Sequence, residues 1–196
     1  MSPLEGEPVT GAPPIPPELA RRVRMVVFDV DGVLTDAGVY LGKGSDGSTV
    51  ELKRFDIQDG LGVKLLMRAG LVVAFLSGRT SEATALRAAE LGVSECLQDD
   101  GARKLSVLRD LLTRHDLEWS EVAMLGDDLP DVPVLERVGF PAAVANATPE
   151  AREHARWCTS AEGGRGAVRE FCRALLLARG EWERVVGEYL DERALD

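Results

Sequence analysis

Residues 25–35, Met-Val-Val-Phe-Asp-Val-Asp-Gly-Val-Leu-Thr, form the stretch from which the fold can be read. Residues 25–28 are an apolar run typical of a buried strand. Asp29 and Asp31 follow it, and side chains two apart share one face of an extended chain. Carboxylates that close together repel unless a cation or a shared proton neutralises them. Because no histidine or thiolate lies nearby, we predict Mg²⁺, against the simpler alternatives of a turn, a helix cap or a calcium-loop fragment.

Apolar and helical patterns alternate along the rest of the chain. Strands are predicted near 24–29, 72–76, 95–97, 122–125 and 142–144. Helices are predicted over 61–69, 81–91, 102–115 and 167–178. Continuous apolar strands separated by amphipathic helices are typical of a parallel sheet covered on both faces. The predicted fold class is therefore α/β, with a doubly wound, Rossmann-like parallel sheet.

The sequence divides into three parts. Residues 1–20 hold six of the ten prolines, which predicts a flexible tail with little to bury. Residues 21–180 are predicted to form the folded domain and residues 181–196 a C-terminal helix or tail. Within the domain, residues 37–55 read as a β-hairpin around a glycine-rich turn. Ligands bind beyond the carboxyl ends of the strands in such sheets, so we expect this hairpin to be a flap over the site rather than a decorative surface feature.

Composition excludes several classes of function. The formal net charge of −10 and the pI near 4.8 argue against nucleic-acid and membrane partners. The three cysteines, Cys96, Cys158 and Cys172, have no paired spacing, so neither a disulfide framework nor a zinc site is predicted. No apolar run reaches the roughly 18 residues of a membrane span, and no signal-peptide pattern is present. We expect a cytoplasmic protein.

Three further polar segments follow predicted strands, at the sheet edge where Asp29 and Asp31 are expected. Ser77, Gly78 and Arg79 follow the strand at 72–76, Lys104 begins the helix after the third strand, and an acidic segment follows the strand at 122–125. Each segment alone has a simpler explanation, as an N-cap, a solvated lysine or a helix start. The ordered set is not plausibly accidental.

In this order the segments resemble the haloacid dehalogenase-like phosphatases, whose motifs are Asp-x-Asp, Ser or Thr, Lys, and a glycine-acidic loop. The resemblance implies that Asp29 attacks phosphorus to form an aspartyl-phosphate. It also implies that Asp31 protonates the leaving alcohol and then activates water. Ser77 is implied to hydrogen-bond the phosphoryl group, and Lys104 to neutralise it and steady Asp29.

The same resemblance implies a magnesium site. Its implied ligands are Asp29, Asp31 through its backbone carbonyl, Asp127 and Asp128. Asp128 is implied either to hold metal-bound water or to orient Lys104. In a phosphoryl-transfer site of this kind, every motif has a role.

Two intervals between the motifs could carry a cap domain, one after Asp31 and one between Ser77 and Lys104, and neither is long enough for a large one. The hairpin is therefore the only minimal cap that the sequence predicts. The chain looks closest to the 3-deoxy-D-manno-octulosonate 8-phosphate (KDO 8-phosphate) phosphatases over about residues 22–185. The segments that carry this likeness are 29–36, 55–60, 126–129 and 163–170. The likeness implies hydrolysis of KDO 8-phosphate to KDO and phosphate by a homotetramer built around the hairpins. The residues implied to bind substrate are Asp56, Gln58, Asp59, Gly60, Lys64, Gly78, Arg79, Arg87 and, on a glycine hinge, Arg165.

Some positions depart from the subgroup's pattern. Asp56 stands where Asn is expected and Lys64 where Arg is expected, which changes the charge and fork geometry facing the substrate. Asp99 and Asp100 add negative charge just before Lys104. These changes favour, as the alternative substrate, a nonulosonate 9-phosphate of the sialic acid or KDN type.

A non-enzymatic phospho-acceptor module is the other alternative. Response-regulator receivers also combine acidic residues, a hydroxyl and a lysine on a doubly wound sheet. In receivers, however, the acidic residues at the first strand are adjacent, and a separate acceptor Asp follows the third strand. Here Val30 separates the first pair, and a second acidic loop follows Lys104. The filled motifs also disfavour a catalytically retired binding subunit.

Overall fold

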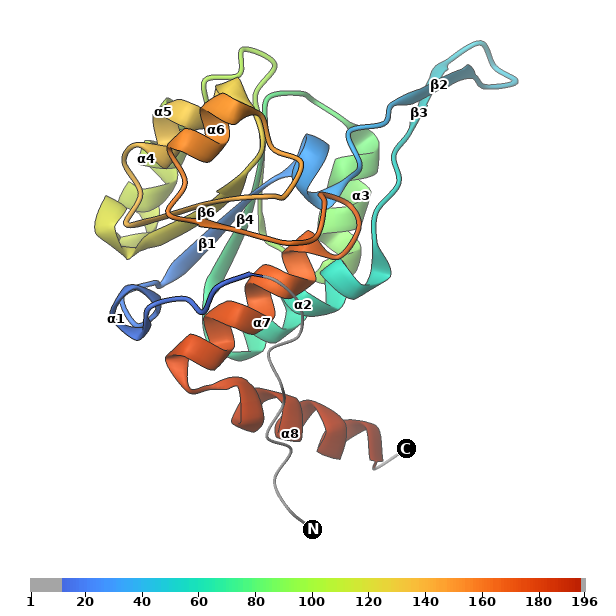
Figure 1. Ribbon diagram of the computed structural model, residues 1–196. Coiled ribbons are helices and arrows are strands. Elements are labelled where there is room, and N and C mark those ends of the chain that lie inside the picture. Colours follow the sequence, from blue (N-terminus) through green and yellow to red (C-terminus); the bar gives the residue numbers. More distant parts are fainter. Residues whose placement is uncertain (1–11, 195–196) are drawn as a thin grey trace.

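A six-stranded parallel sheet lies at the centre of the computed structural model, which describes residues 12–194. The strand order is β5-β4-β1-β6-β7-β8 (Figure 1). The strands are β1 (Met25–Asp29), β4 (Val72–Ser77), β5 (Glu95–Gln98), β6 (Val122–Gly126), β7 (Phe140–Ala143) and β8 (Trp157–Cys158). The predicted α/β class and the five predicted strands are confirmed. The short edge strand β8 was not predicted.

Helices cover both faces of the sheet (Figure 1). One face carries α1 (Pro17–Ala20), α2 (Ile57–Arg68), α3 (Glu82–Leu91), α7 (Ala167–Arg179) and α8 (Trp182–Ala194). The other carries α4 (Lys104–His115), α5 (Val132–Leu135) and α6 (Pro149–Glu153). Short turns η1 (Val30–Leu34), η2 (Trp119–Glu121) and η3 (Leu129–Asp131) complete the connections. Across residues 12–194, every helix is too short or too polar to cross a membrane.

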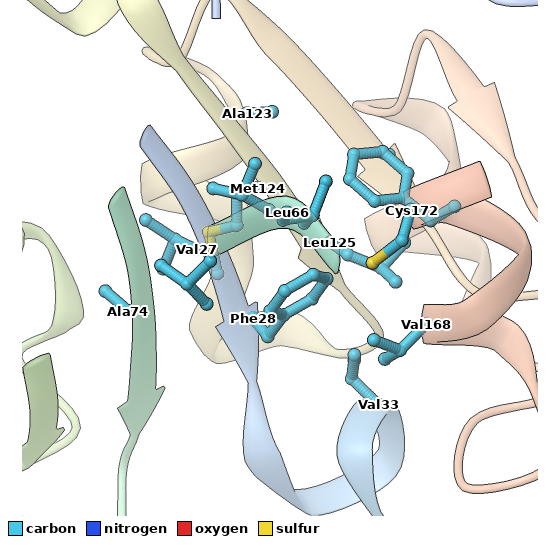
Figure 2. Packing of buried hydrophobic residues seen from close by; sticks show 14 of the residues in the cluster. Val27, Phe28, Val33, Leu66, Ala74, Ala123, Met124, Leu125, Val168 and Cys172 are labelled. Atoms are coloured by element: carbon cyan, nitrogen blue, oxygen red, sulfur yellow. The ribbon is translucent and has the colours of Figure 1, made fainter. Parts of the chain in front are cut away.

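The core holds β1 rigidly in the middle of the sheet. Residues 25–28 are fully buried, and Figure 2 shows Phe28 packed with Val168 and Cys172 of α7. The rings of Phe28 and Phe171 meet edge to face with centroids 6.1 Å apart. Such an aromatic pair adds about 0.5–1.5 kcal/mol to the burial of its area. Asp29 at the end of β1 and Asp31 just after it are therefore held at a fixed position in the fold.

The N-terminal segment that the structure describes, residues 12–20, packs against the domain. The prediction of a tail with little to bury is wrong for this segment, because Ile15 is buried in the core. Trp157 also donates from Nε1 to the carbonyl of Pro13 at 2.6 Å. Prolines restrict the unfolded backbone, so ordering this segment costs less entropy than ordering an ordinary one. The rest of the predicted tail, residues 1–11, lies outside the described residues.

The C-terminal segment forms helix α8, as one of the two predicted alternatives. Val185 anchors it in the core. Arg68 of α2 donates to both carboxylate oxygens of Glu192, one of them at 2.7 Å. Bidentate pairs of this kind fix orientation as well as distance. Residues 195–196 lie outside the described part of the chain.

The predicted hairpin is present as β2 (Tyr40–Lys43) and β3 (Thr49–Leu52), paired antiparallel. It projects away from the sheet (Figure 1). Leu41 and Leu52 are 70% and 62% exposed. The base of the hairpin, rather than its tip, reaches the carboxyl edge of the sheet. In a single chain the hairpin therefore stands beside the site.

Candidate active site

The turn after β1 brings two acidic loops into contact. Asp29 is the last residue of β1 and is buried. Gly32 has φ +105°, a conformation that side chains rarely adopt. A Cβ at Gly32 would also overlap the Asp127 carboxylate. Glycine is therefore required here on both counts, and its small size lets the loop after β6 approach Asp29.

Three carboxylates and one ammonium form the centre of the site. Carboxylate oxygens of Asp29, Asp127 and Asp131 lie within 4.8 Å of one another. Lys104, at the start of α4, donates from Nζ to Asp29 Oδ1 and, at 2.7 Å, to Asp131 Oδ1. Asp29, Asp131 and Lys104 are all buried. One cation thus faces three acids.

The pKa shifts report this imbalance of charge. Burial, followed by the charge of Asp131, raises the pKa of Asp29 well above its ordinary value, with Lys104 opposing. Burial and Asp131 also raise the pKa of Asp127 to about 7. Burial alone would lower the pKa of Lys104, but the carboxylates of Asp29 and Asp131 hold it above its ordinary value. An additional cation would relieve the repulsion that remains.

The donor set fits a small, hard divalent cation. Asp127 Oδ1 is buried and has no hydrogen-bond partner within residues 12–194. Both oxygens of Asp131 already accept hydrogen bonds, Oδ1 from Lys104 and Oδ2 from the backbone N–H of Asp127 at 2.9 Å and of Asp128 at 3.3 Å. Asp29 and Asp127 therefore have the more available oxygen atoms of the three carboxylates. Oxygen donors of this kind suit Mg²⁺.

Asp128 lies apart from this cluster, which corrects its expected place as a metal ligand or a partner of Lys104. Its side chain is exposed and caps η3, accepting from the N–H of Leu129 at 2.7 Å. Asp131 contacts Lys104 instead, because η3 turns the chain back toward the sheet. The residues predicted for the site do not include Asp131. Its spacing of four from Asp127, about one helical turn, was the available signal.

Ser77 and Asp31 complete the predicted catalytic group. Ser77, at the end of β4, is buried, and its Oγ lies 3.4 Å from Asp31 Oδ2. The same Oγ accepts from the N–H of Arg79 at 3.1 Å. Gly78 lies against Ala102, with a Cβ at that position 3.2 Å from the alanine Cβ. The strand ends thus bring Asp29, Asp31, Ser77 and Lys104 together.

Two charged residues at the hairpin base belong to the site and were not predicted from the sequence. Lys53 Nζ lies 2.7 Å from Asp31 Oδ1, and the Lys53 side chain is 0% exposed. Glu51 Oε2 accepts from Arg79 Nη2 at 2.8 Å. The alternation of apolar and charged residues over 50–53 was the available signal, since alternate side chains of a strand face opposite sides.

Several predicted substrate-binding residues secure α2 within the single chain. Asp56 caps the helix, accepting from the N–H of Gln58 at 2.8 Å. Arg87 donates to the Asp56 carbonyl at 2.9 Å and to Glu90 at 2.8 Å. A Cβ at Gly60 would overlap the Arg87 guanidinium, so glycine permits this packing. These contacts therefore hold α2 in place within one chain.

Asp59 is buried and faces α7, which corrects its expected contact with a sugar acid. Its Oδ1 accepts from the N–H of Arg169 at 2.7 Å, and its Oδ2 from the N–H of Gly166 at 3.3 Å. A carboxylate at a helix N-terminus satisfies donors that have no partner within the helix. Lys64, by contrast, is an exposed side chain of α2.

Asp59→Asn is expected to remove one component of the pH dependence of stability. Burial raises the pKa of Asp59 from 3.8 to about 6, although the N–H of Arg169 opposes the shift. From about pH 4 to pH 6 the unfolded chain releases this proton first, so the Asp59 contribution to stability falls as pH rises. Urea unfolding at pH 4 and pH 7 measures the effect. Asp59→Asn should gain stability relative to the wild type at pH 7, and an equal pH response in both proteins would contradict the assignment.

The segment that carries Arg165 meets the site through its backbone. A Cβ at Gly163 would overlap the carbonyl of Gly32, so this glycine allows the segment to lie directly on the turn after Asp29. The Arg165 side chain is exposed, with Nε 3.9 Å from Glu162 Oε2. In the single chain it makes this surface pair, whereas the resemblance implied a contact in the active site of its own chain or of a neighbouring copy.

The acidic residues before Lys104 are already paired. Asp99 accepts from the Arg103 guanidinium at 2.9 Å, and this contact lowers the Asp99 pKa. Asp100 accepts from the N–H of Thr80 at 2.6 Å. The extra negative charge noted in the sequence is therefore held by local donors.

Comparison with known proteins identifies relatives over most of the chain. A family described as haloacid dehalogenase-like hydrolase matches residues 92–170. The 3-deoxy-D-manno-octulosonate 8-phosphate phosphatase KdsC of Escherichia coli K12 is 39% identical over 169 residues, which cover 86% of this chain and 87% of that protein. KdsC of Yersinia pestis is 38% identical over 168 residues, with 86% and 87% covered.

Solved structures show the same relationship. A probable YrbI family phosphatase from Pseudomonas syringae has a TM-score of 0.81 at 45% identity, covering 89% of this chain and 96% of its own. The KDO 8-phosphate phosphatase of Moraxella catarrhalis, solved with magnesium, phosphate and KDO, has a TM-score of 0.81 at 34% identity, with 88% and 97% covered. With its parallel sheet and clustered motifs, this chain belongs to the haloacid dehalogenase-like hydrolases, within the family of KDO 8-phosphate phosphatases.

Proposed function

We propose that this phosphatase is Mg²⁺-dependent and hydrolyses KDO 8-phosphate to KDO and phosphate. The observation that carries the proposal is the convergence of Asp29, Asp31, Ser77, Lys104 and Asp127 at the carboxyl edge of the sheet. The relatives named for this substrate, and the Moraxella structure that holds magnesium, phosphate and KDO, support the choice of substrate.

The reaction uses the two aspartates in turn. A carboxylate oxygen of Asp29 attacks phosphorus, the Asp29 O–P bond forms, and the bond from phosphorus to the sugar oxygen breaks. Asp31 gives its proton to the leaving alkoxide. Asp31 then takes a proton from water, whose oxygen attacks phosphorus, so that phosphate leaves and Asp29 is regenerated.

The neighbouring groups hold the reactants and their charge. Lys104 steadies Asp29 through Oδ1 and faces the phosphoryl oxygens together with the Ser77 hydroxyl. Asp131 orients Lys104. Asp29 and Asp127 would hold Mg²⁺, with the Asp31 carbonyl as a further proposed ligand. When bound, Mg²⁺ neutralises the carboxylates and the charge that develops on the phosphoryl group.

Positively charged side chains near the site offset, locally, the negative charge of the whole protein. Arg79 Nη1 lies 4.0 Å from Asp31 Oδ1, and its side chain is about half exposed at the rim of the site. A guanidinium there is placed to bind the carboxylate of a sugar acid. The formal charge of −10 supports the prediction that the protein works without nucleic-acid or membrane partners, and a cytoplasmic location stays a prediction of the composition.

The hairpin supports assembly into the homotetramer that the resemblance implies. Its exposed apolar side chains are those of Val39, Tyr40, Leu41, Val50 and Leu52. Apolar patches of this kind are typical of interaction sites. Hairpins from neighbouring copies would bury these side chains and close the site that a single chain leaves open. Sedimentation of the full chain measures the oligomeric state.

A phosphate-release assay tests the substrate. The full chain with Mg²⁺ should prefer KDO 8-phosphate over a nonulosonate 9-phosphate and p-nitrophenyl phosphate, and EDTA should abolish release until Mg²⁺ is restored. Preference for the nine-carbon substrate would establish the alternative phosphatase. A stable phosphoprotein without turnover would favour a phospho-acceptor and overturn the proposal.

A further inference from the structure

Lys53, at the base of the hairpin, makes the shortest side-chain contact to Asp31 among the described residues. The distance from Lys53 Nζ to Asp31 Oδ1 is 2.7 Å. Ser77 Oγ is 3.4 Å from the other oxygen, and Arg79 lies at 4.0 Å with a partly exposed side chain. The Lys53 side chain is 0% exposed. The ammonium is therefore the contact that defines the position of the Asp31 carboxylate.

The surroundings of Lys53 restrict its movement. Its Nζ also lies 3.4 Å from Thr84 Oγ1 on α3 and 3.7 Å from Glu51 Oε1. Glu51 is itself held by Arg79 and Ser81, the latter at 2.6 Å. A buried ammonium is costly unless it is paired, so these partners fix one geometry. The hairpin base and the active-site loops are thereby joined.

We propose that Lys53 is a positioning residue for the proton transfers of Asp31. Through Lys53, these transfers depend on the position of the hairpin base against the rest of the domain. This inference rests on the proposed function. Asp31 follows β1 in the turn that contains Gly32. The backbone there is not paired with a neighbouring strand, so strand pairing does not fix the position of the Asp31 side chain. Lys53 fixes Oδ1, which leaves Oδ2 beside Ser77 to face the leaving oxygen.

The competing explanation is that Lys53 only fastens the hairpin to the domain. The two roles differ in their dependence on the leaving group. An alkoxide needs a proton as it leaves phosphorus, whereas p-nitrophenolate leaves without one. Hydrolysis of the aspartyl-phosphate needs Asp31 with either substrate. Misplacement of Asp31 therefore affects both steps for KDO 8-phosphate but only the second step for the aryl ester.

Lys53→Met is the test, and Lys43→Met is the matched control. Lys43 lies on the same hairpin but is exposed, with Nζ 3.0 Å from Thr49 Oγ1. We expect Lys53→Met to lower kcat for KDO 8-phosphate by about 100-fold, as for a misplaced catalytic group, with little change in KM. Lys43→Met should behave as the wild type.

Rapid mixing with p-nitrophenyl phosphate supplies the second measurement. Lys53→Met should release a burst of about one p-nitrophenolate per active site, followed by slow turnover, because the phosphoenzyme forms and then persists. Asp31→Asn should show the same pattern. Equal losses on both substrates without a burst, or full activity, would overturn the role of Lys53.

Two comparisons keep the outcomes separate. If Asp31→Asn lacks the leaving-group effect and the burst, the proposed mechanism fails whatever Lys53 does. If Asp31→Asn shows both and Lys53→Met shows neither, the inference about Lys53 alone fails. Should Lys53→Met not fold, Lys53→Arg keeps the charge but moves the donors. For this variant, a larger loss of kcat/KM on KDO 8-phosphate than on the aryl ester, with a burst on the aryl ester, supports the proposal. An equal loss of kcat/KM on both substrates without a burst contradicts it.

Discussion

Asp29→Asn is expected to lower turnover by roughly 10⁴- to 10⁶-fold, the range seen when a covalent nucleophile is removed. The amide is a poor nucleophile toward phosphorus, so the first step is lost. The amide carries no charge, however, and its oxygen still accepts from Lys104. Because burial and Asp131 already disfavour the ionised form of Asp29, the metal-free variant should melt no lower than the wild type.

Phosphate release from KDO 8-phosphate and thermal unfolding without metal measure these two effects. Asp128→Asn is the matched control, since Asp128 is an exposed cap of η3 outside the cluster. It should keep turnover close to that of the wild type. Turnover of Asp29→Asn within tenfold of the wild type would show that another group attacks phosphorus.

Lys104→Met is expected to damage both catalysis and stability. Loss of a preorganised donor to the phosphoryl group costs about 10²- to 10³-fold in kcat. Removal of one partner from a buried ion pair costs about 3–5 kcal/mol of the free energy of unfolding. Here Asp29 and Asp131 would both be left buried without the ammonium. The loss of stability should therefore be largest in EDTA and smaller with Mg²⁺.

Urea unfolding with and without Mg²⁺ checks this expectation. Adding Asp131→Asn to Lys104→Met should restore part of the stability, because one unpaired charge is removed, and a double-mutant cycle measures the coupling. Lys43→Met controls for the loss of an exposed lysine, and should change stability by no more than about 0.5 kcal/mol. Equal losses in the two lysine variants would contradict the role given to the buried pair.

The structure brings together those predicted site residues whose placement depends on strand ends. Asp29, Ser77 and Asp127 lie far apart in the chain, yet Asp29 and Ser77 each end a strand and Asp127 directly follows one. In a parallel sheet these ends meet at one edge, so knowing the strands was enough to expect the residues to meet. Lys104 was expected at the same edge because it begins α4, the helix that follows β5.

The errors fall where a side chain's direction depends on distant neighbours. Asp128 and Asp131 are both acidic and three apart, and the turn of η3 decides that Asp131 meets Lys104. Asp59 belongs to a motif that resembles a substrate contact, but packing of α2 against α7 turns it toward the N–H of Arg169. Sequence spacing alone does not distinguish these directions.

The sequence by itself determined the parallel sheet, the hairpin and the phosphatase motifs, because apolar periodicity and the residues after each strand are local properties of the chain. The tertiary structure alone decided that Asp131 holds Lys104, that Lys53 reaches Asp31 and that residues 12–20 pack on the core. Each of these depends on contacts between segments distant in sequence. Their energies come from burial and charge pairing that exist only when those segments meet.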